Sequence, residues 1–436
     1  MIEKNSYDLK INKLDFKIFL IAIFLLASAP FFSAIIFLYL TIKGTYKSFY
    51  SVIRDKYNLV IFLISLIMLI QCVIYTFFDN TAIKQWDSQL HWAGIANWIP
   101  LFLLFIGLQP YLSNEDNRLK TAKFFIAGSF PVIASCLFQF IFGWHGPFET
   151  LNGLIKWFQV PYGGEQSVTG LFNNPNYTGS WLTLIFPLLL ACLKDKFRKK
   201  ELIKFKILLL IISTFTFSII LTNSRAAFIG LIISIPIIFG RRIIKSFNFL
   251  ILIVLIFLSA YYFFPDSLLN EIFNNSFFKD NYLISKFTSM FYSLNNEIRI
   301  SIWSNAISYI QEKPLFGWGS SSFPLLFRIQ NNIWYGHTHN LFLELAVSYG
   351  LIISLLVFSF LLNIIYRSYF IVFKNEENDS LIDKGYWAGS FIFFIAQLYD
   401  VLYFDFRLNI ATWIFLAGLK SIIDKNNKPK NLSKFN

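Results

Sequence analysis

Two of the four histidines in this 436-residue chain, His337 and His339, lie two positions apart in the segment 337–340. They come just before an apolar run, 341–365, which is long enough to cross a membrane. Histidine is the side chain whose unperturbed pKa lies closest to neutral pH, so it is suited to act as a general base. A base at a membrane face, with arginines upstream in the sequence, predicts chemistry on an anionic, lipid-linked substrate.

The histidine pair has two other interpretations. With Glu344 it could hold a metal ion, but a His-x-His step with one carboxylate is a weak ligand set, and no cysteine lies near. It could instead cap the following helix, where Asn340 is itself a favourable N-cap residue. From these residues alone, capping is narrowly favoured over catalysis, and a general base is favoured over a metal ligand.

Two arginines could bind an anion beside the histidines. Arg225 lies in the turn between two barely separated apolar runs, where it either faces a polar cavity or extends to the lipid headgroups. Arg299 falls in the first turn of a helix that Asn295 or Asn296 caps and Pro314 ends. The predicted apolar face of that helix consists of Ile300, Trp303, Ile307 and Ile310.

The position of Arg299 is informative because a cation in the first turn opposes the helix dipole. Stability alone therefore does not explain it, whereas an arginine beside free backbone N–H groups makes a good anion site. The alternative is a surface arginine on an amphipathic helix at the membrane interface.

The composition indicates a membrane protein. The chain is 56% hydrophobic and 14% charged, whereas soluble domains contain about 25% charged residues. The three cysteines, Cys72, Cys136 and Cys192, all fall in apolar runs, which argues against a disulfide framework or a zinc site. The net charge of +13 is concentrated in loops between apolar runs, so we do not expect nucleic acid as a partner. We interpret residues 1–436 as one transmembrane domain.

Apolar runs near the spanning length of ~20 residues recur along the chain. They lie at 58–78, 92–108, 121–142, 173–193, 204–222, 225–240, 246–264, 341–365, 385–403 and 405–423. The run 16–42 is long for one helix and contains Pro30, so we interpret it as a tight pair of crossings. The sequence thus predicts an all-α polytopic integral membrane protein with about 11–12 transmembrane helices, with twelve favoured.

The basic residues orient these crossings by the positive-inside rule. Alternate connections, including the block Lys194 to Lys206 and both ends of the chain, are rich in lysine and arginine and are predicted to be cytoplasmic. The opposite connections include two notable segments, 143–172 and the long helical loop 265–340. Long loops in compact proteins are usually functional.

Other polar groups lie at the ends of apolar runs. Asp400, Asp405 and Arg407 flank the last turn, and we interpret Asp405 and Arg407 as an interfacial pair. The segment 170–176 is either a helix cap and turn or a loop that faces the substrate.

Several motifs together resemble the O-antigen ligase and polymerase superfamily, the membrane glycosyltransferases of the Wzy_C type. They are Ser224-Arg225-Ala226-Ala227 at the start of a run, Arg299-x3-Trp303, Pro314-x2-Gly317-x-Gly319, His339-Asn340 followed by Gly350, and Gly170-x2-Asn173-x2-Asn176. The resemblance covers most of the chain and is best over 165–365. Each motif is weak alone, but their order and spacing are specific to the superfamily.

The resemblance implies a multi-pass enzyme of the bacterial inner membrane whose active site faces the periplasm. The donor would be a glycan linked to undecaprenyl diphosphate, and the acceptor a lipid A core sugar, a lipid-linked glycan or a protein hydroxyl. The reaction would be metal-independent and inverting, without a cofactor. His339 would be the base, Arg225 and Arg299 would hold the diphosphate, and the residues assigned to substrate binding are His337, Asn340, Asn176, Gly317 and Gly319.

The chemistry agrees with this assignment, because two arginines can each offer a bidentate fork to a departing diphosphate. No Asp-x-Asp motif appears in the segments predicted to be extracytoplasmic. The alternative function is a membrane transporter or accessory protein for a small anion such as bicarbonate, because the superfamily also contains members proposed to act in bicarbonate accumulation. Transporters tend to show internal repeats and charges at the membrane midplane, whereas here the polar residues gather at one face.

Overall fold

The computed structural model describes residues 11–47, 49–77, 89–163, 167–240, 297–374 and 379–426 of the chain. These ranges are mostly helical. The α-helices of the described ranges are α1 (Lys13–Leu25), α2 (Pro30–Lys47), α3 (Phe49–Arg54), α4 (Lys56–Phe77), α5 (Gln89–Ile95), α6 (Ile99–Leu108), α7 (Glu115–Gly128), α8 (Phe130–Phe142), α9 (Pro175–Arg198), α10 (Leu202–Leu221), α11 (Arg225–Phe239), α16 (Glu297–Glu312), α17 (Phe323–Asn331), α18 (Leu341–Tyr369), α19 (Leu381–Ala396) and α20 (Phe406–Asn426). Two strands, β1 (Phe148–Thr150) and β2 (Ile155–Trp157), form an antiparallel hairpin.

The predicted all-α polytopic membrane fold is confirmed. In the described ranges, seven helical segments are long and apolar enough to cross a membrane, and α11 is a shorter apolar helix. Together with α11 they follow eight of the predicted runs. The runs 16–42 and 385–403 form the helices α1, α2 and α19, which are not among these segments, and the run 246–264 lies outside the described residues. The total of 11–12 crossings and the sidedness of the membrane remain predictions.

The run 16–42 forms two helices, α1 and α2, as its proline predicted. Pro30 is the first residue of α2, a position where the missing N–H costs nothing. The two helices pack against each other, and Phe19 contacts Phe37 across the pair. A local backbone signal was therefore enough to locate this break.

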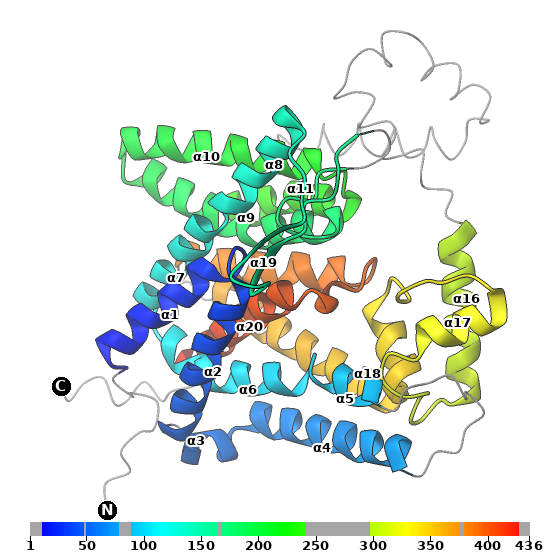
Figure 1. Cartoon of the computed structure of the whole chain (residues 1–436). Helices are drawn as coiled ribbons and strands as arrows, with labels where there is room; N and C mark the ends of the chain where they lie inside the picture. Colours follow the sequence, from blue (N-terminus) through cyan, green and yellow to red (C-terminus); the bar gives the residue numbers. More distant parts are fainter. Residues whose placement is uncertain are drawn as a thin grey trace, which may run out of the picture.

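Helix α9 is largely buried and packs against α10, α11 and α19 (Figure 1). Asn174 caps its start and Pro175 occupies its first position, so the sequence fixes where it begins. The beginnings of α9 and α18 lie near the end of α19, which brings segments far apart in the chain to one end of the bundle. This end contains the predicted site residues.

The long loop contributes α16 and α17, which pack against α18 at one side of the bundle (Figure 1). Arg299 lies in the first turn of α16 and the helix ends two residues before Pro314, both as predicted. The proposed caps and the loop residues before α16 lie outside the described residues.

The predicted apolar face of α16 is wrong in part. Ile310 is buried, but Ile300 is 70% exposed and Ile307 is 48% exposed. The buried face instead contains Ile302, Ala306 and Tyr309, which form a small core with residues of α17 and α18. The helix turns this face inward because its neighbours lie on that side, which the repeat of isoleucines does not reveal.

The segment 314–319 packs into a break in α18 at Gly350. This glycine has φ +82°, so the helical hydrogen bonding is interrupted there. The backbone N–H groups of Trp318 and Gly319 donate to the carbonyls of Val347 and Ser348 at 2.8 and 3.0 Å. The glycines of this motif therefore have a structural role in the described fold, and their assignment to substrate binding remains a prediction.

We expect Gly350→Ala to destabilise the protein by about 1–3 kcal/mol, since a left-handed conformation is unfavourable for alanine. A Cβ atom would also lie 2.1 Å from the carbonyl oxygen of Leu315. Thermal unfolding of the purified protein in detergent measures the effect. Gly336→Ala is the matched control, because a Cβ there meets no atom within 4 Å. Equal unfolding temperatures for the two variants would contradict the structural role of Gly350.

Candidate active site

The segment with the two histidines is held between α18 and the loop after α19. Asn340 caps α18 by accepting a hydrogen bond from the backbone N–H of Leu343 at 3.1 Å. Its side-chain amide also donates to the carbonyl of Leu398 at 3.1 Å. Asn340 is thus the cap that the sequence indicated, while the histidines have other partners. His339 has φ +54°, an unusual backbone conformation for a residue with a side chain.

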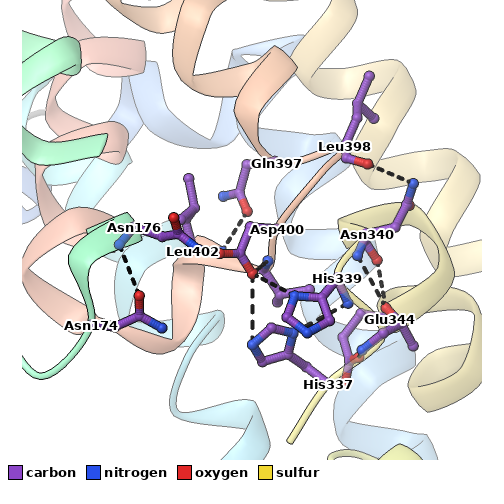
Figure 2. A network of polar contacts seen from close by, with 12 residues as sticks. Asn174, Asn176, His337, His339, Asn340, Glu344, Gln397, Leu398, Asp400 and Leu402 are labelled. Atoms are coloured by element: carbon purple, nitrogen blue, oxygen red, sulfur yellow. Dashed lines mark hydrogen bonds and ion pairs between the residues drawn. The ribbon is translucent and has the colours of Figure 1, made fainter. Parts of the chain in front are cut away.

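His339 forms a hydrogen-bonded pair with Asp400. The His339 Nδ1 atom lies 3.1 Å from Oδ1 of Asp400, which is 5% exposed (Figure 2). The other carboxylate oxygen accepts from the side-chain amide of Asn176 at 3.0 Å, and Oδ1 also accepts from the backbone N–H of Val401 at 2.9 Å. These contacts fix the carboxylate so that it faces the imidazole ring.

The electrostatics favour an ionised Asp400. Burial raises the pKa of this carboxyl, but the hydrogen bond from His339 and the charges of both histidines outweigh burial and hold the pKa below its usual value. An ionised carboxylate only accepts hydrogen bonds, so His339 donates from Nδ1. The Nε2 atom of a neutral His339 then has a lone pair that can accept a proton. The pair therefore has the chemistry of an oriented general base.

His337 supports this arrangement from the other side. Its Nδ1 atom accepts the backbone N–H of His339 at 3.2 Å, and its Nε2 atom lies 3.7 Å from Oδ1 of Asp400. Burial lowers the pKa of His337 to about 4, helped by the charges of His339 and Arg299 and opposed by Asp400. His337 is thus neutral at pH 7.

We expect the neutral state of His337 to make stability depend on pH. Because its folded pKa of about 4 lies below the ordinary value of 6.5, the unfolded chain takes up the proton first as the pH falls. The contribution of His337 to stability is therefore fully present above pH 6.5 and is lost as the pH falls from 6.5 to 4, by at most about 3–4 kcal/mol. Unfolding temperatures across this range should fall less steeply in His337→Gln than in the wild type.

The exposed histidine His145 provides the matched control for this pH dependence. In His145→Gln the unfolding temperature should depend on pH as it does in the wild type, since the His145 side chain lies outside the buried cluster. A slope in His337→Gln as steep as that of the wild type would show that another group causes the pH dependence.

Arg225 and Arg299 lie within electrostatic range of each other. Arg225 is the first residue of α11, where Ser224 is the N-cap, and the turn before it packs against Gly179 of α9. The charge of Arg299 also acts on His337. The structure thus places both predicted arginines in one region with the histidine segment.

Trp303 sets the position of α16 relative to the histidines. Its indole N–H donates to the carbonyl of Thr338 at 3.0 Å. Arg299 is one helical turn earlier, on the same side of α16. The spacing of Arg299 and Trp303 therefore has a physical reason, since anchoring one residue positions the other.

The segment 170–176 is ordered by a buried ion pair. The sequence predicted that Asp405 and Arg407 form a pair, and the Arg407 guanidinium donates a hydrogen bond to the Asp405 carboxylate. Arg407 also donates to the carbonyl of Leu171 at 3.1 Å. The guanidinium also lies 3.8 Å from the centre of the Phe172 ring. This pair holds the segment in place ahead of Asn176, whose contact with Asp400 adds a positioning role to its predicted role in substrate binding.

Asp400 is the residue that sequence reasoning did not assign to the site. It is 61 residues from His339, and no spacing or motif connects the two. The available signal was an ionisable side chain at the end of an apolar run, which is often functional. It identified a candidate position without identifying the partner.

His337, His339 and Asp400 also form a possible metal site, the one group of its kind found in the described ranges. Their ligand atoms lie within 4.8 Å of one another. Glu344, the carboxylate that the sequence suggested, instead accepts the backbone N–H of Thr338 at 2.9 Å. Because Nδ1 of His337 accepts a hydrogen bond, a neutral ring has its proton on Nε2, the nitrogen that faces Asp400. This tautomer fits a proton-transfer site better than a metal centre.

Comparison with known proteins finds one family match within the chain. Residues 208–359 match the family model described as O-antigen ligase. This range includes both arginines and both histidines, and it ends before Asp400. No curated protein matches the sequence. The family match agrees with the resemblance that the motifs predicted: the region 208–359 of this chain is similar to the O-antigen ligase family.

Proposed function

We propose that this protein transfers a glycan from an undecaprenyl-diphosphate-linked donor to a hydroxyl acceptor. The family match supports a membrane glycosyltransferase of the O-antigen ligase or polymerase type. The observation that supports the finer assignment best is the 3.1 Å contact between His339 and Asp400, which orients a general base. The donor, the acceptor and the mechanism are parts of this proposal.

In the proposed reaction, Nε2 of His339 takes the proton of the acceptor hydroxyl. The hydroxyl oxygen forms a bond to the anomeric carbon while the bond from that carbon to the diphosphate oxygen breaks. The diphosphate leaves with the electron pair, and the single displacement inverts the anomeric centre. Asp400 stabilises the imidazolium that forms, as a buried carboxylate does for histidine in other enzymes.

The two arginines would bind the diphosphate. Arg225 and Arg299 repel each other through space, and an anion between two cations offsets such repulsion. Each guanidinium can donate two parallel hydrogen bonds to phosphate oxygens. Their effect would be largest as negative charge grows on the leaving group.

The arrangement along α9 supports a periplasmic site in the inner membrane. The helix begins beside the Asn176–Asp400 contact and ends in the lysine-rich block that the positive-inside rule assigns to the cytoplasm. Its 24 residues extend about 36 Å, enough to cross the ~30 Å hydrocarbon core. The proposed site would thus lie at the opposite membrane face from the basic block.

We expect chelators to leave the activity of the purified enzyme unchanged. The reason is the hydrogen bonding of His337, whose preferred neutral tautomer keeps a proton on the nitrogen that faces Asp400. Donor turnover with and without EDTA is the measurement. Complete loss of turnover in EDTA, with recovery after a divalent ion is added, would overturn metal independence and favour the His337–His339–Asp400 metal site.

The glycan profile of a deletion strain tests the proposed function and separates its two main forms. Loss of all long chains from lipid A indicates a ligase, whereas retention of a single repeat on lipid A indicates a polymerase. An unchanged profile of lipid-linked, lipid A-linked and protein-linked glycans would contradict a role in glycan transfer.

A further inference from the structure

A pocket with a charged rim lies at the other end of the bundle from His339. Its volume is about 700 Å³, and residues of α7, α9, α10 and the start of α19 line it. Helix α9 runs from the His339–Asp400 pair to this pocket. Asn176 at the start of the helix contacts Asp400, and Arg198 at its end lines the pocket. Helix α19 runs the opposite way, from Leu381 in the pocket to the loop that contains Asp400. The pocket is therefore separate from the proposed active site.

The rim of the pocket contains more basic than acidic side chains. Most of the basic groups already have carboxylate partners. Lys196 and Lys199 pair with Asp195 at 3.4 and 3.0 Å, and Arg198 pairs with Asp379 at 2.8 Å. Lys204 pairs with Glu201, a carboxylate that it shares with Lys196. These ion pairs order the rim and hold the ends of the helices together.

Lys123 differs from the other cations of the rim. Its side chain is exposed, and among the described residues no carboxylate lies within salt-bridge distance of it. It lies on α7 between Leu119 and Ile126, which line the pocket with Ile207 and Leu208 of α10. Ile207 is 54% exposed, so part of this apolar wall is open to the surroundings of the bundle. A cation thus lies beside an apolar wall, between helices that are expected to be embedded in lipid.

We infer that this pocket binds one anionic phospholipid of the leaflet predicted to be cytoplasmic. The phosphate would bind at Lys123 and the neighbouring basic rim, and an acyl chain would lie along the wall formed by α7 and α10. Basic pockets between transmembrane helices on the cytoplasmic side suit anionic headgroups, because they combine charge attraction with apolar contact. This site is independent of the glycan transfer proposed above, and it would anchor the ends of α7, α9 and α10 to the membrane.

Lipid binding to the full-length purified protein tests this inference. Delipidated protein in detergent is titrated with phosphatidylglycerol or with phosphatidylcholine of the same acyl chains, and bound lipid is counted by native mass spectrometry. The wild type should bind one phosphatidylglycerol at least fivefold more tightly than phosphatidylcholine. Lys123→Gln should weaken phosphatidylglycerol binding about fivefold, the factor expected for one basic side chain near a lipid headgroup. It should leave phosphatidylcholine binding unchanged.

Lys120→Gln is the matched control. It removes the same charge from the same helix, but Lys120 pairs with Asp116 and does not line the pocket. It should bind phosphatidylglycerol as the wild type does. Ile207→Gln, a change at an exposed position, should weaken the binding of both lipids because the contact with the acyl chain is lost. Equal affinity of the wild type for the two lipids would overturn the inference, as would equal loss in Lys120→Gln and Lys123→Gln. Full displacement of the lipid by millimolar inorganic phosphate would instead identify a plain phosphate site.

Discussion

Replacing His339 with alanine is expected to abolish glycan transfer, with a loss on the order of 10²–10⁴ in rate. The physical reason is the contact of its Nδ1 atom with Asp400, which leaves Nε2 to accept the proton of the acceptor hydroxyl. Alanine has no group that can take this proton. Donor turnover by the purified protein, with a saturating acceptor, measures the loss.

A second variant separates chemistry from folding, because the backbone at His339 is unusual. With φ +54°, alanine is strained there, whereas asparagine tolerates the left-handed region well. His339→Asn also keeps an N–H donor for Asp400 but has no basic nitrogen. It should be as inactive as His339→Ala while unfolding near the wild-type temperature. His145→Ala, at an exposed histidine, should keep full activity. Wild-type transfer by His339→Asn would remove the general base from the mechanism.

The second large effect is expected for the two arginines. If Arg225 and Arg299 hold the donor diphosphate, replacement by lysine should lower turnover on the order of 10²–10³ in each case. Lysine keeps the positive charge but loses the planar fork that binds two phosphate oxygens at once. If Arg225 only extends to the headgroups and Arg299 only solvates a helix, lysine should serve nearly as well.

Donor turnover in nanodiscs by the two single variants is the appropriate measurement. Arg328→Lys is the matched control, since Arg328 is an exposed arginine of α17 in the same long loop. It should turn over donor as the wild type does. Near wild-type rates for both Arg225→Lys and Arg299→Lys would remove the arginines from the mechanism and favour a role outside glycan transfer, such as anion transport.

The sequence by itself determined the membrane class, most of the helices and the chemical types of the site. Apolar runs fix where helices form because length and hydrophobicity are local properties of a segment. Breaks and caps are local as well, so Pro30, Pro314 and Asn340 marked helix ends correctly. The motifs at Arg225, Arg299 and His339 likewise predicted the family that residues 208–359 match.

Only the tertiary structure decided which side chains meet. The partner of His339 is Asp400, which lies in the loop after α19. No local pattern encodes a contact between residues 61 positions apart. The buried face of α16 follows from the positions of α17 and α18, so the spacing of isoleucines pointed to the wrong side. Gly350 likewise opens α18 to a segment some thirty residues earlier in the chain. In each case a residue's neighbours across the fold set its role, and those neighbours are determined by the packing of whole helices.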